Sequence, residues 1–308
     1  MPTATPGIHH VTAVASDPQR TVEFYTETLG LRLVKRSVNQ DDVSVYHLFY
    51  GDHEGTPGTG MTVFPYPDAD GGRVGTGQVS TVSFLVPDGS LEYWRDRLAE
   101  ADADPGSPHD RFGNTVLPAT DPDGLPLELV ARADAPPANL PESPVPHAHA
   151  IRGFFGVTLS LTSGDATGDL LKGMGYRQTN RDGTRLRYEA GGDLGYVVDI
   201  VEEPQARPGI PGAGTVHHVA FRVDDDEQDE WRQFLIDRGL RPTEVIDRTW
   251  FESVYAREYE SVLFEFATES PGYTVDEDLE ALGERLVLPA WLEDRREEIE
   301  AELPDLTG

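Results

Sequence analysis

The segment GIHHVTAVASD, residues 7–17, alternates apolar and polar side chains as a half-buried β-strand does, and it ends in a turn signal. The same pattern returns in QVSTVSFLVPD from residue 78, GFFGVTLSLTS from residue 153 and TVHHVAFRVDD from residue 215. A pattern that recurs at an interval of about 70 residues is typical of a chain built from copies of one supersecondary unit. The sequence therefore predicts four structural repeats.

Each repeat continues with a helix and several short strands. In the first copy, Asp17 is expected to cap a helix that begins at Pro18 and ends before Gly30. Amphipathic segments occupy the same place in the later copies: GSLEYWRDRLAEADA, DLLKGMGY and DEQDEWRQFLIDRGL. Short β-rich runs follow each of them, so the unit is βαβββ. The predicted fold class is α+β, with four units paired into two open-barrel halves and a C-terminal helical tail.

The domain boundaries follow from composition. Units one and two form a predicted N-terminal half, residues 1–132, and units three and four form a C-terminal half, residues 151–269. The Pro-rich, aperiodic stretch at 133–150 is interpreted as the linker between them. In the tail, residues 270–308, the segments YTVDEDLEALGERL and WLEDRREEIEAEL are expected to be helices that pack on the body.

The charge balance excludes several classes of partner. The 308 residues include 55 acidic and 25 basic side chains, a formal net charge of −30, which argues against binding nucleic acid or anionic membranes. Lys35 and Lys172 are the only lysines, and such an acidic, lysine-poor chain suggests a halophilic protein whose repulsion is screened by salt. No signal peptide or membrane-length apolar run is visible, so a cytoplasmic location is expected.

The absence of cysteine leaves His, Asp and Glu as candidate metal ligands. Strand side chains alternate between two faces, so adjacent histidines cannot both face one cavity without a bulge. The polar face of the first strand contains His10, and that of the strand at 215 contains His218. On the last strand of unit four, Glu265 lies opposite an apolar face. Two imidazoles and one carboxylate are the ligand set of non-haem Fe(II) enzymes that activate O₂.

Units two and three lack this set. They carry Thr81 and Gly156 at the histidine positions, although they keep the acids Glu128 and Asp199, which are expected to be structural. One half therefore looks metallated and the other looks vacant.

The remaining histidines leave alternatives open. For His9 and His217, packing between sheet and helix and a supporting role behind the ligands are equal alternatives. His47 faces either the cavity or solvent, and we expect it to be structural.

The repeats, together with YHLFYGDHEGTPGTGMTVFP, IDRTWFESVYARE and PGYTVDEDLEALGERLVLPAWLE, resemble the vicinal oxygen chelate superfamily, which contains glyoxalase I and bleomycin-resistance proteins. Within it, the GTPGT run and the LVLPAWLE segment look like the ring-cleaving dioxygenase branch that opens hydroquinones. The resemblance covers nearly the whole chain.

The resemblance implies Fe(II), replaceable by Mn(II), at positions that match His10, His218 and Glu265. Catechol-cleaving relatives take their first histidine from the third unit, where this chain has Gly156, and this departure favours the hydroquinone branch. The implied partners are a small aromatic diol and O₂.

The same resemblance implies that Thr12, His217, Arg248 and Tyr255 lie on the substrate side, and His9 is expected beside them. We expect Arg248 to bind substrate and to stabilise developing anionic charge, while Tyr255 or His217 donates or accepts a proton.

Two other functions stay open on the sequence alone. A glyoxalase-type isomerase or lyase would use Zn(II) or Ni(II), but its site usually needs four protein ligands and only three share a face here. A non-enzymatic binding or resistance protein of the same superfamily would need no such ligands, and the fold cannot separate these readings. The oligomeric state is equally open between a monomer and a homo-oligomer.

Overall fold

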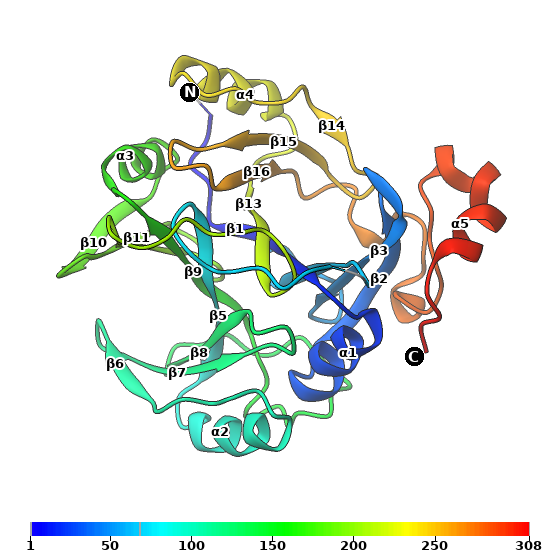
Figure 1. Cartoon of the computed structure of the whole chain (residues 1–308), viewed down its shortest axis with the longest axis horizontal. Coiled ribbons are helices and arrows are strands. Elements are labelled where there is room, and N and C mark those ends of the chain that lie inside the picture. Colours follow the sequence, from blue (N-terminus) through cyan, green and yellow to red (C-terminus); the bar gives the residue numbers. More distant parts are fainter. Residues whose placement is uncertain (1, 68, 308) are drawn as a thin grey trace.

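Each repeat folds as a strand, a helix and a three-stranded antiparallel meander, as the sequence predicted (Figure 1). The computed structural model describes residues 2–67 and 69–307. Residues 1 and 68 of the predicted N-terminal half and residue 308 of the predicted tail therefore lie outside it. Unit one contains β1 (Ile8–Ala15), α1 (Pro18–Val22) with its π-helical continuation η1 (Glu23–Thr28), β2 (Arg32–Asn39), β3 (Asp42–Gly51) and β4 (Gly60–Pro65). Unit two contains β5 (Gln78–Pro87), α2 (Leu91–Glu100), β6 (His109–Arg111), β7 (Asn114–Thr120) and β8 (Pro126–Arg132).

The second half of the chain repeats this order. Unit three contains β9 (Gly153–Leu161), α3 (Asp165–Gly173), β10 (Arg177–Asp182), β11 (Arg185–Glu189) and β12 (Val197–Glu202). Unit four contains β13 (Thr215–Arg222), α4 (Gln228–Asp237), β14 (Ile246–Asp247), β15 (Glu252–Arg257) and β16 (Leu263–Ala267). The predicted helix start is confirmed in unit one, where the Asp17 side chain accepts a hydrogen bond from the backbone N–H of Arg20 and Pro18 is the first helical residue.

The four units form two curled eight-stranded sheets. The first sheet has the order β14-β15-β16-β13-β1-β4-β3-β2 and joins unit four to unit one. The second has the order β10-β11-β12-β9-β5-β8-β7-β6 and joins unit three to unit two. The predicted halves at 1–132 and 151–269 group units that are adjacent in sequence, so they do not coincide with these sheets. Periodicity could not show this, because all four first strands have the same apolar pattern and any two of them could pair.

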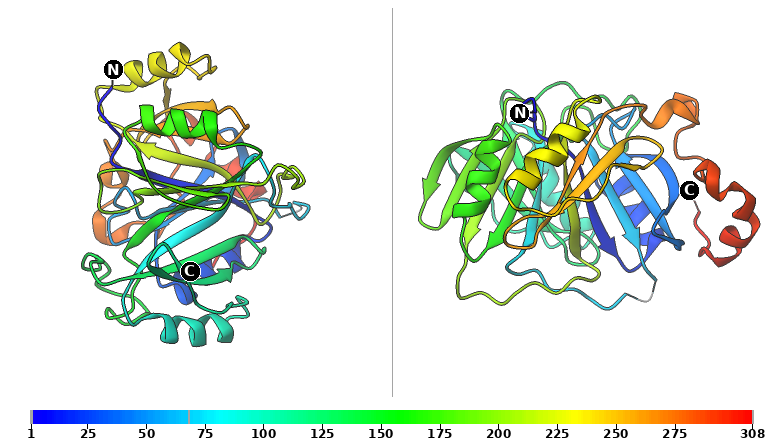
Figure 2. Two further views of the ribbon diagram at one scale, coloured as in Figure 1. Left: turned by 90° about the vertical axis from the view of Figure 1, so that its left-hand side faces the viewer. Right: turned by 90° about the horizontal axis from the view of Figure 1, so that it is seen from above.

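Helices cover the outer faces of both sheets, which leaves the inner faces concave (Figures 1 and 2). In unit four, Trp231 of α4 stacks on Phe266 of β16, and Phe221 of β13 contacts Phe264 and Phe266. Burial of these rings fixes which side of β13 and β16 faces the helix. The alternate side chains of both strands must therefore face the concave side.

Two β-bulges interrupt the pairing of β1 with β13. Ile8 pairs with Phe221 but His10 pairs with Ala220, so His9 is the extra residue on β1. On β13, His217 is the extra residue in the same way, because Thr12 pairs with His218 and Ala13 pairs with Val216. A bulge sets two successive side chains against one residue of the partner strand. The first histidine of each pair is therefore released from strict alternation.

The C-terminal tail lies against β2 and β3 at one end of the molecule (Figure 2). Its second predicted helix is present as the 3₁₀ segment η4 (Ala290–Arg295) and α5 (Arg296–Glu302). The first predicted helix is wrong: residues 273–286 contain only the 3₁₀ turns η2 (Tyr273–Val275) and η3 (Leu279–Ala281). The buried Lys35 ammonium bonds the Tyr273 carbonyl oxygen and the carboxylates of Asp276 and Glu277, so the segment wraps around this charge instead.

Residues 133–150 contain no helix or strand, as expected of a linker, yet Leu140, Val145 and Ala150 are buried. The stretch is thus packed on the body. Among the described residues, 2–67 and 69–307, no helix combines the length and apolar character that crossing a membrane requires.

Candidate metal centre

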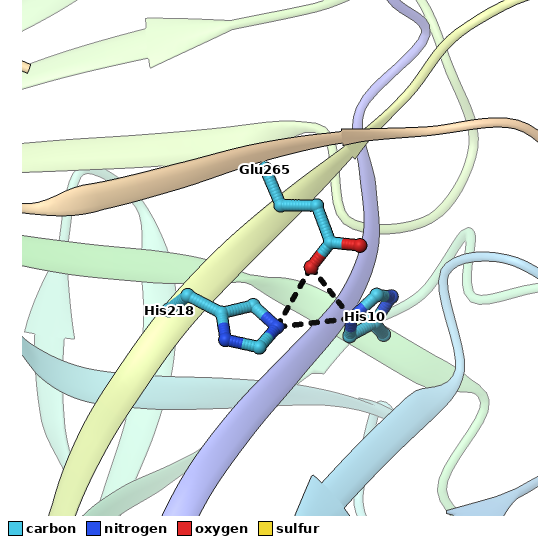
Figure 3. A group of neighbouring side chains, drawn as sticks. All are labelled: His10, His218 and Glu265. Atoms are coloured by element: carbon cyan, nitrogen blue, oxygen red, sulfur yellow. Dashed lines mark hydrogen bonds and ion pairs between the residues drawn. The ribbon is translucent and has the colours of Figure 1, made fainter. Parts of the chain in front are cut away.

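The concave face of the first sheet gathers His10, His218 and Glu265 (Figure 3). They come from β1, β13 and β16, and all three are buried. Strand register brings them together, because β1 pairs with β13 and Ala220 of β13 pairs with Glu265. The Nε2 atoms of the two histidines lie 3.2 Å apart, and Glu265 Oε2 lies 3.2 Å from His10 Nε2 and 2.8 Å from His218 Nε2.

These three atoms fit a divalent cation. Glu265 Oε2 is buried and, although both imidazole nitrogens face it, it has no hydrogen-bond partner of good geometry. Ligand atoms about 2.1 Å from a metal and at right angles to one another would be ~3.0 Å apart, close to the separations here. Burial opposes the charge of Glu265, but His10 and His218 outweigh it and hold the pKa of this carboxyl well below its usual value. Glu265 is thus an anion between two imidazoles.

His9 contacts His10 from behind the three-residue group. The Nδ1 atoms of His9 and His10 are 2.9 Å apart, so one of these two nitrogens donates to the other. Burial, followed by His10, lowers the pKa of His9 to about 3, so His9 is neutral. A neutral His9 has one ring nitrogen with a lone pair, and through Nδ1 it can accept the Nδ1–H of His10. In that arrangement the lone pair of His10 is left on Nε2, which faces Glu265.

His217 repeats this contact in β13, with 2.7 Å between its Nδ1 atom and that of His218. It differs from His9 in being exposed on the cavity wall. Both residues sit at bulges with Nδ1 against the neighbouring histidine, which is the arrangement that the predicted supporting role requires. The duplicated pairs thus place one imidazole at the centre and one behind it.

In unit one, the strand position that corresponds to Glu265 of unit four is occupied by Thr62, which carries a hydroxyl instead of a carboxylate. Thr62 of β4 pairs with Thr12, just as Glu128 pairs with Ser83, Asp199 with Thr158 and Glu265 with Ala220. The Thr62 and Thr12 hydroxyls are 2.7 Å apart, and the Thr12 hydroxyl lies 2.9 Å from His218 Nε2. A site with four protein ligands would require a metal-binding side chain at residue 62.

A cavity of about 240 Å³ opens beside His10 and His218 of this group. Its wall combines His10, His217 and His218 with aromatic rings and the β2–β3 turn: Phe49, Phe64, Trp250, Phe251, Tyr255 and residues 39–42. Arg248 lies between the turn and Tyr255, donating from Nε to the Tyr255 hydroxyl oxygen at 3.1 Å and from Nη2 to Asp41 Oδ2 at 3.0 Å. Three of the predicted substrate-side residues, His217, Arg248 and Tyr255, therefore line the cavity, whereas Thr12 and His9 are buried and do not belong to its wall.

Sequence reasoning missed three contributors. Ser253 donates a hydrogen bond to Glu265 Oε1 at 2.5 Å, and Phe251 packs over the rings of His9 and His10. His47, expected to be structural, lines the cavity and lies 3.0 Å from the Thr62 hydroxyl. Ser253 and His47 each stand two residues from an aromatic side chain on a β-strand, and this alternation was the available signal.

The acids of the second sheet are paired with arginines. Glu128 accepts two hydrogen bonds from Arg111, at 2.6 and 2.7 Å. Asp199 accepts two from Arg187, at 2.8 and 2.9 Å, and one from Arg185 at 3.0 Å. These ion pairs agree with the expected structural role of both acids.

The paired βαβββ units and the buried His-His-Glu group define a metal-site protein of the vicinal oxygen chelate class. The chain belongs to the Glyoxalase/Bleomycin resistance protein/Dioxygenase superfamily, whose family model matches residues 7–129. Two relatives are similar over nearly the whole chain. The "Putative ring-cleaving dioxygenase MhqO" of Bacillus subtilis (strain 168) is 42% identical over 298 residues, 96% of this chain and 95% of that protein. The "Chlorohydroquinone/hydroquinone 1,2-dioxygenase" of Sphingobium indicum is 34% identical over 310 residues, 97% and 96% of the two chains.

Solved structures agree on the fold. A Bacillus subtilis protein described as a putative dioxygenase superposes with a TM-score of 0.95 at 41% identity, covering 99% of this chain and 98% of that chain. Glyoxalase I from Zea mays superposes with a TM-score of 0.63 at 16% identity over 86% of this chain and 92% of its own. The latter likeness concerns the fold alone.

Proposed function

We propose that the protein is an Fe(II)-dependent dioxygenase that opens the ring of a hydroquinone-like aromatic diol with O₂. The observation that carries the proposal is the set of three ligand atoms, each pair 2.8–3.2 Å apart, at one end of an aromatic-lined cavity. The names of the two relatives support the same reaction class. In this reaction, the ring bond between a hydroxyl-bearing carbon and its neighbour breaks, and both atoms of O₂ enter the product.

His10, His218 and Glu265 would hold the metal. When bound, Fe(II) supplies open coordination positions, acidifies a hydroxyl of the diol and carries electrons from the ring to O₂. Mn(II) is the alternative ion, since the same donor types accept it. His9 and His217 orient the two ligand imidazoles through their Nδ1 contacts.

Arg248 and Tyr255 are proposed to act on the diol from the cavity wall. Burial raises the pKa of Tyr255, with Glu265 adding to the effect, so its hydroxyl stays protonated. Arg248 donates a hydrogen bond to the Tyr255 oxygen. The phenolic proton of Tyr255 is therefore free to be donated to an anionic oxygen of the substrate. His217, exposed in the same cavity, is the candidate for taking or returning a proton.

The proposal is tested by O₂ uptake. Protein loaded anaerobically with Fe(II) receives hydroquinone, catechol and the methylglyoxal–thiol adduct in separate reactions, in molar salt that screens the acidic surface. We expect O₂ consumption with hydroquinone and its loss in His218→Ala. Isomerisation of the thiol adduct without O₂ uptake would replace the proposal with a glyoxalase-type activity.

A further inference from the structure

Thr62 lies beside the candidate metal centre in a set of hydrogen bonds that metal binding does not account for. Units two, three and four place an acid at the position that Thr62 occupies in unit one. Thr62 and Thr12 are both fully buried, and their hydroxyls are 2.7 Å apart. Two buried hydroxyls in contact form a directional pair, because each has one proton to donate.

The hydroxyl pair connects a ligand nitrogen to the cavity wall. At one end, the Thr12 hydroxyl is 2.9 Å from His218 Nε2. At the other end, the Thr62 hydroxyl is 3.0 Å from His47 Nε2. His47 is held in place by Phe49 and Phe64, with ring centroids 3.8 and 4.4 Å away. The chain of contacts therefore runs from His47 through two threonines to the centre.

A bound cation would redirect this chain. It would take the lone pair of His218 Nε2, so the Thr12 hydroxyl could no longer bond that nitrogen. The Thr12 hydroxyl would keep its contact to the Thr62 hydroxyl, and its second hydrogen bond would be free for a group bound beside the ligand atoms. Burial, followed by the nearby His10 and His218, holds the pKa of His47 well below its usual value. Neutral His47 offers one N–H and one lone pair. Its tautomer therefore sets the direction of the hydrogen bonds through Thr62, and with it whether the Thr12 hydroxyl donates or accepts beside the ligand atoms.

We propose that Thr62 and His47 are positioning residues that orient the Thr12 hydroxyl toward the substrate oxygen at the centre. The inference rests on the proposed function for the identity of that substrate. At matching positions of their units, Thr62 of unit one would therefore serve the substrate and Glu265 of unit four would serve the metal. Loss of one such hydrogen bond is expected to change substrate affinity about 3- to 10-fold.

The test compares Thr62→Val, Thr62→Ser and His47→Phe with the double variant Thr62→Val/His47→Phe. The first readout is the dissociation constant of hydroquinone for Mn(II)-loaded protein without O₂, measured by calorimetry. The second is the kcat and KM of the Fe(II)-loaded protein. Thr158→Val serves as the matched control, because Thr158 holds the Thr12 position in unit three.

We expect unchanged metal content, hydroquinone binding weakened about 3- to 10-fold in Thr62→Val and His47→Phe, and recovery in Thr62→Ser. The double variant should be no weaker than the single ones, because both break the same chain. Additive losses, or dissociation constants equal to wild type, would overturn the inference. If Thr62→Val loses the fold, His47→Phe carries the test, since His47 lines the cavity edge.

The two proposals can fail separately. Wild-type protein that binds hydroquinone but consumes no O₂ would overturn the dioxygenase proposal, and the four dissociation constants would still decide the role of Thr62 and His47. Wild-type turnover with unchanged kinetics and binding in both single variants would overturn only the positioning role.

Discussion

The two sheets place the same bulges at matching positions and fill their concave faces with different chemistry. In the first sheet the bulged residues are His9 and His217, each followed by a histidine of the candidate metal site. In the second sheet the extra residues are Ser80 on β5 and Phe155 on β9, followed by Thr81 and Gly156. The bulge thus belongs to the fold, and the residue that follows it decides whether a metal site can form.

The acids show the same division. Glu265 faces two imidazoles, whereas Asp199 and Glu128 each face arginines, and the Arg187 guanidinium also packs over the ring of Phe155. A guanidinium is always charged and binds a carboxylate at two points, so these acids are fully occupied. One backbone frame thus supports a candidate metal centre in the first sheet and a buried ion-pair cluster in the second.

Glu265→Gln is expected to have the largest effect, because it removes the carboxylate from the three ligand atoms. Metal affinity should fall by more than the roughly 100-fold that loss of an outer partner costs, and O₂ uptake should disappear. Metal analysis after dialysis measures the first change. Glu128→Gln in the second sheet is the matched control and should keep full metal content. Equal metal loss in both variants would mean that the two concave faces are not functionally distinct.

Asp199→Asn should have the opposite profile: lower stability and unchanged metal binding. The variant leaves Arg187 buried beside a neutral side chain, which is expected to reduce the free energy of unfolding by about 3–5 kcal/mol. Urea denaturation measures the change. Asp169→Asn removes an exposed pair with Lys172 in the same unit and should stay within about 0.5 kcal/mol of wild type. An unaltered stability in Asp199→Asn would show that the cluster does not hold the second sheet.

Gly156→Ala tests why unit three cannot carry a ligand histidine. A Cβ atom on Gly156 would lie 2.0 Å from the Val197 carbonyl oxygen, so the strands must separate, at a cost of about 1–3 kcal/mol. In unit one the arrangement is reversed, because His10 pairs with Gly60. Gly191→Ala, which meets no atom within 4 Å, is the control. Equal thermal unfolding of the two alanine variants would refute this steric account.

His9→Leu should produce the smallest change. Loss of the contact to His10 Nδ1 is expected to weaken metal binding about 10- to 100-fold without removing a ligand. A competition titration with a chelator measures it. The paired variant His217→Leu should weaken binding less, because His217 is exposed and water can replace it beside His218. The reverse ranking would show that the burial of His9 does not make its contact to His10 the more important of the two.

The sequence predicted the repeats, the capped helix at Pro18 and the candidate ligands, because all of these depend on local periodicity and residue type. Strand periodicity alone did not assign the pairing of unit one with unit four, since the first strands are alike in pattern, although the predicted ligand set of His10, His218 and Glu265 required these two units to meet. The tail segment at residues 273–286 was mispredicted as a helix because two of its acids, Asp276 and Glu277, bind the buried Lys35, which lies 241 and 242 residues away along the chain.

The sequence by itself determined the unit, its fourfold repetition and the donor types available to a metal, because alternation and composition are properties of the chain. The sequence also grouped His10 with His218 and Glu265 as one candidate ligand set, by residue type and by resemblance. Only the tertiary structure showed the strand pairing, across more than 200 residues, that brings these side chains together. It also decided the roles of Thr62 and His47 as neighbours of the centre. A hydrogen bond between strands has no signature in the order of residues along either strand.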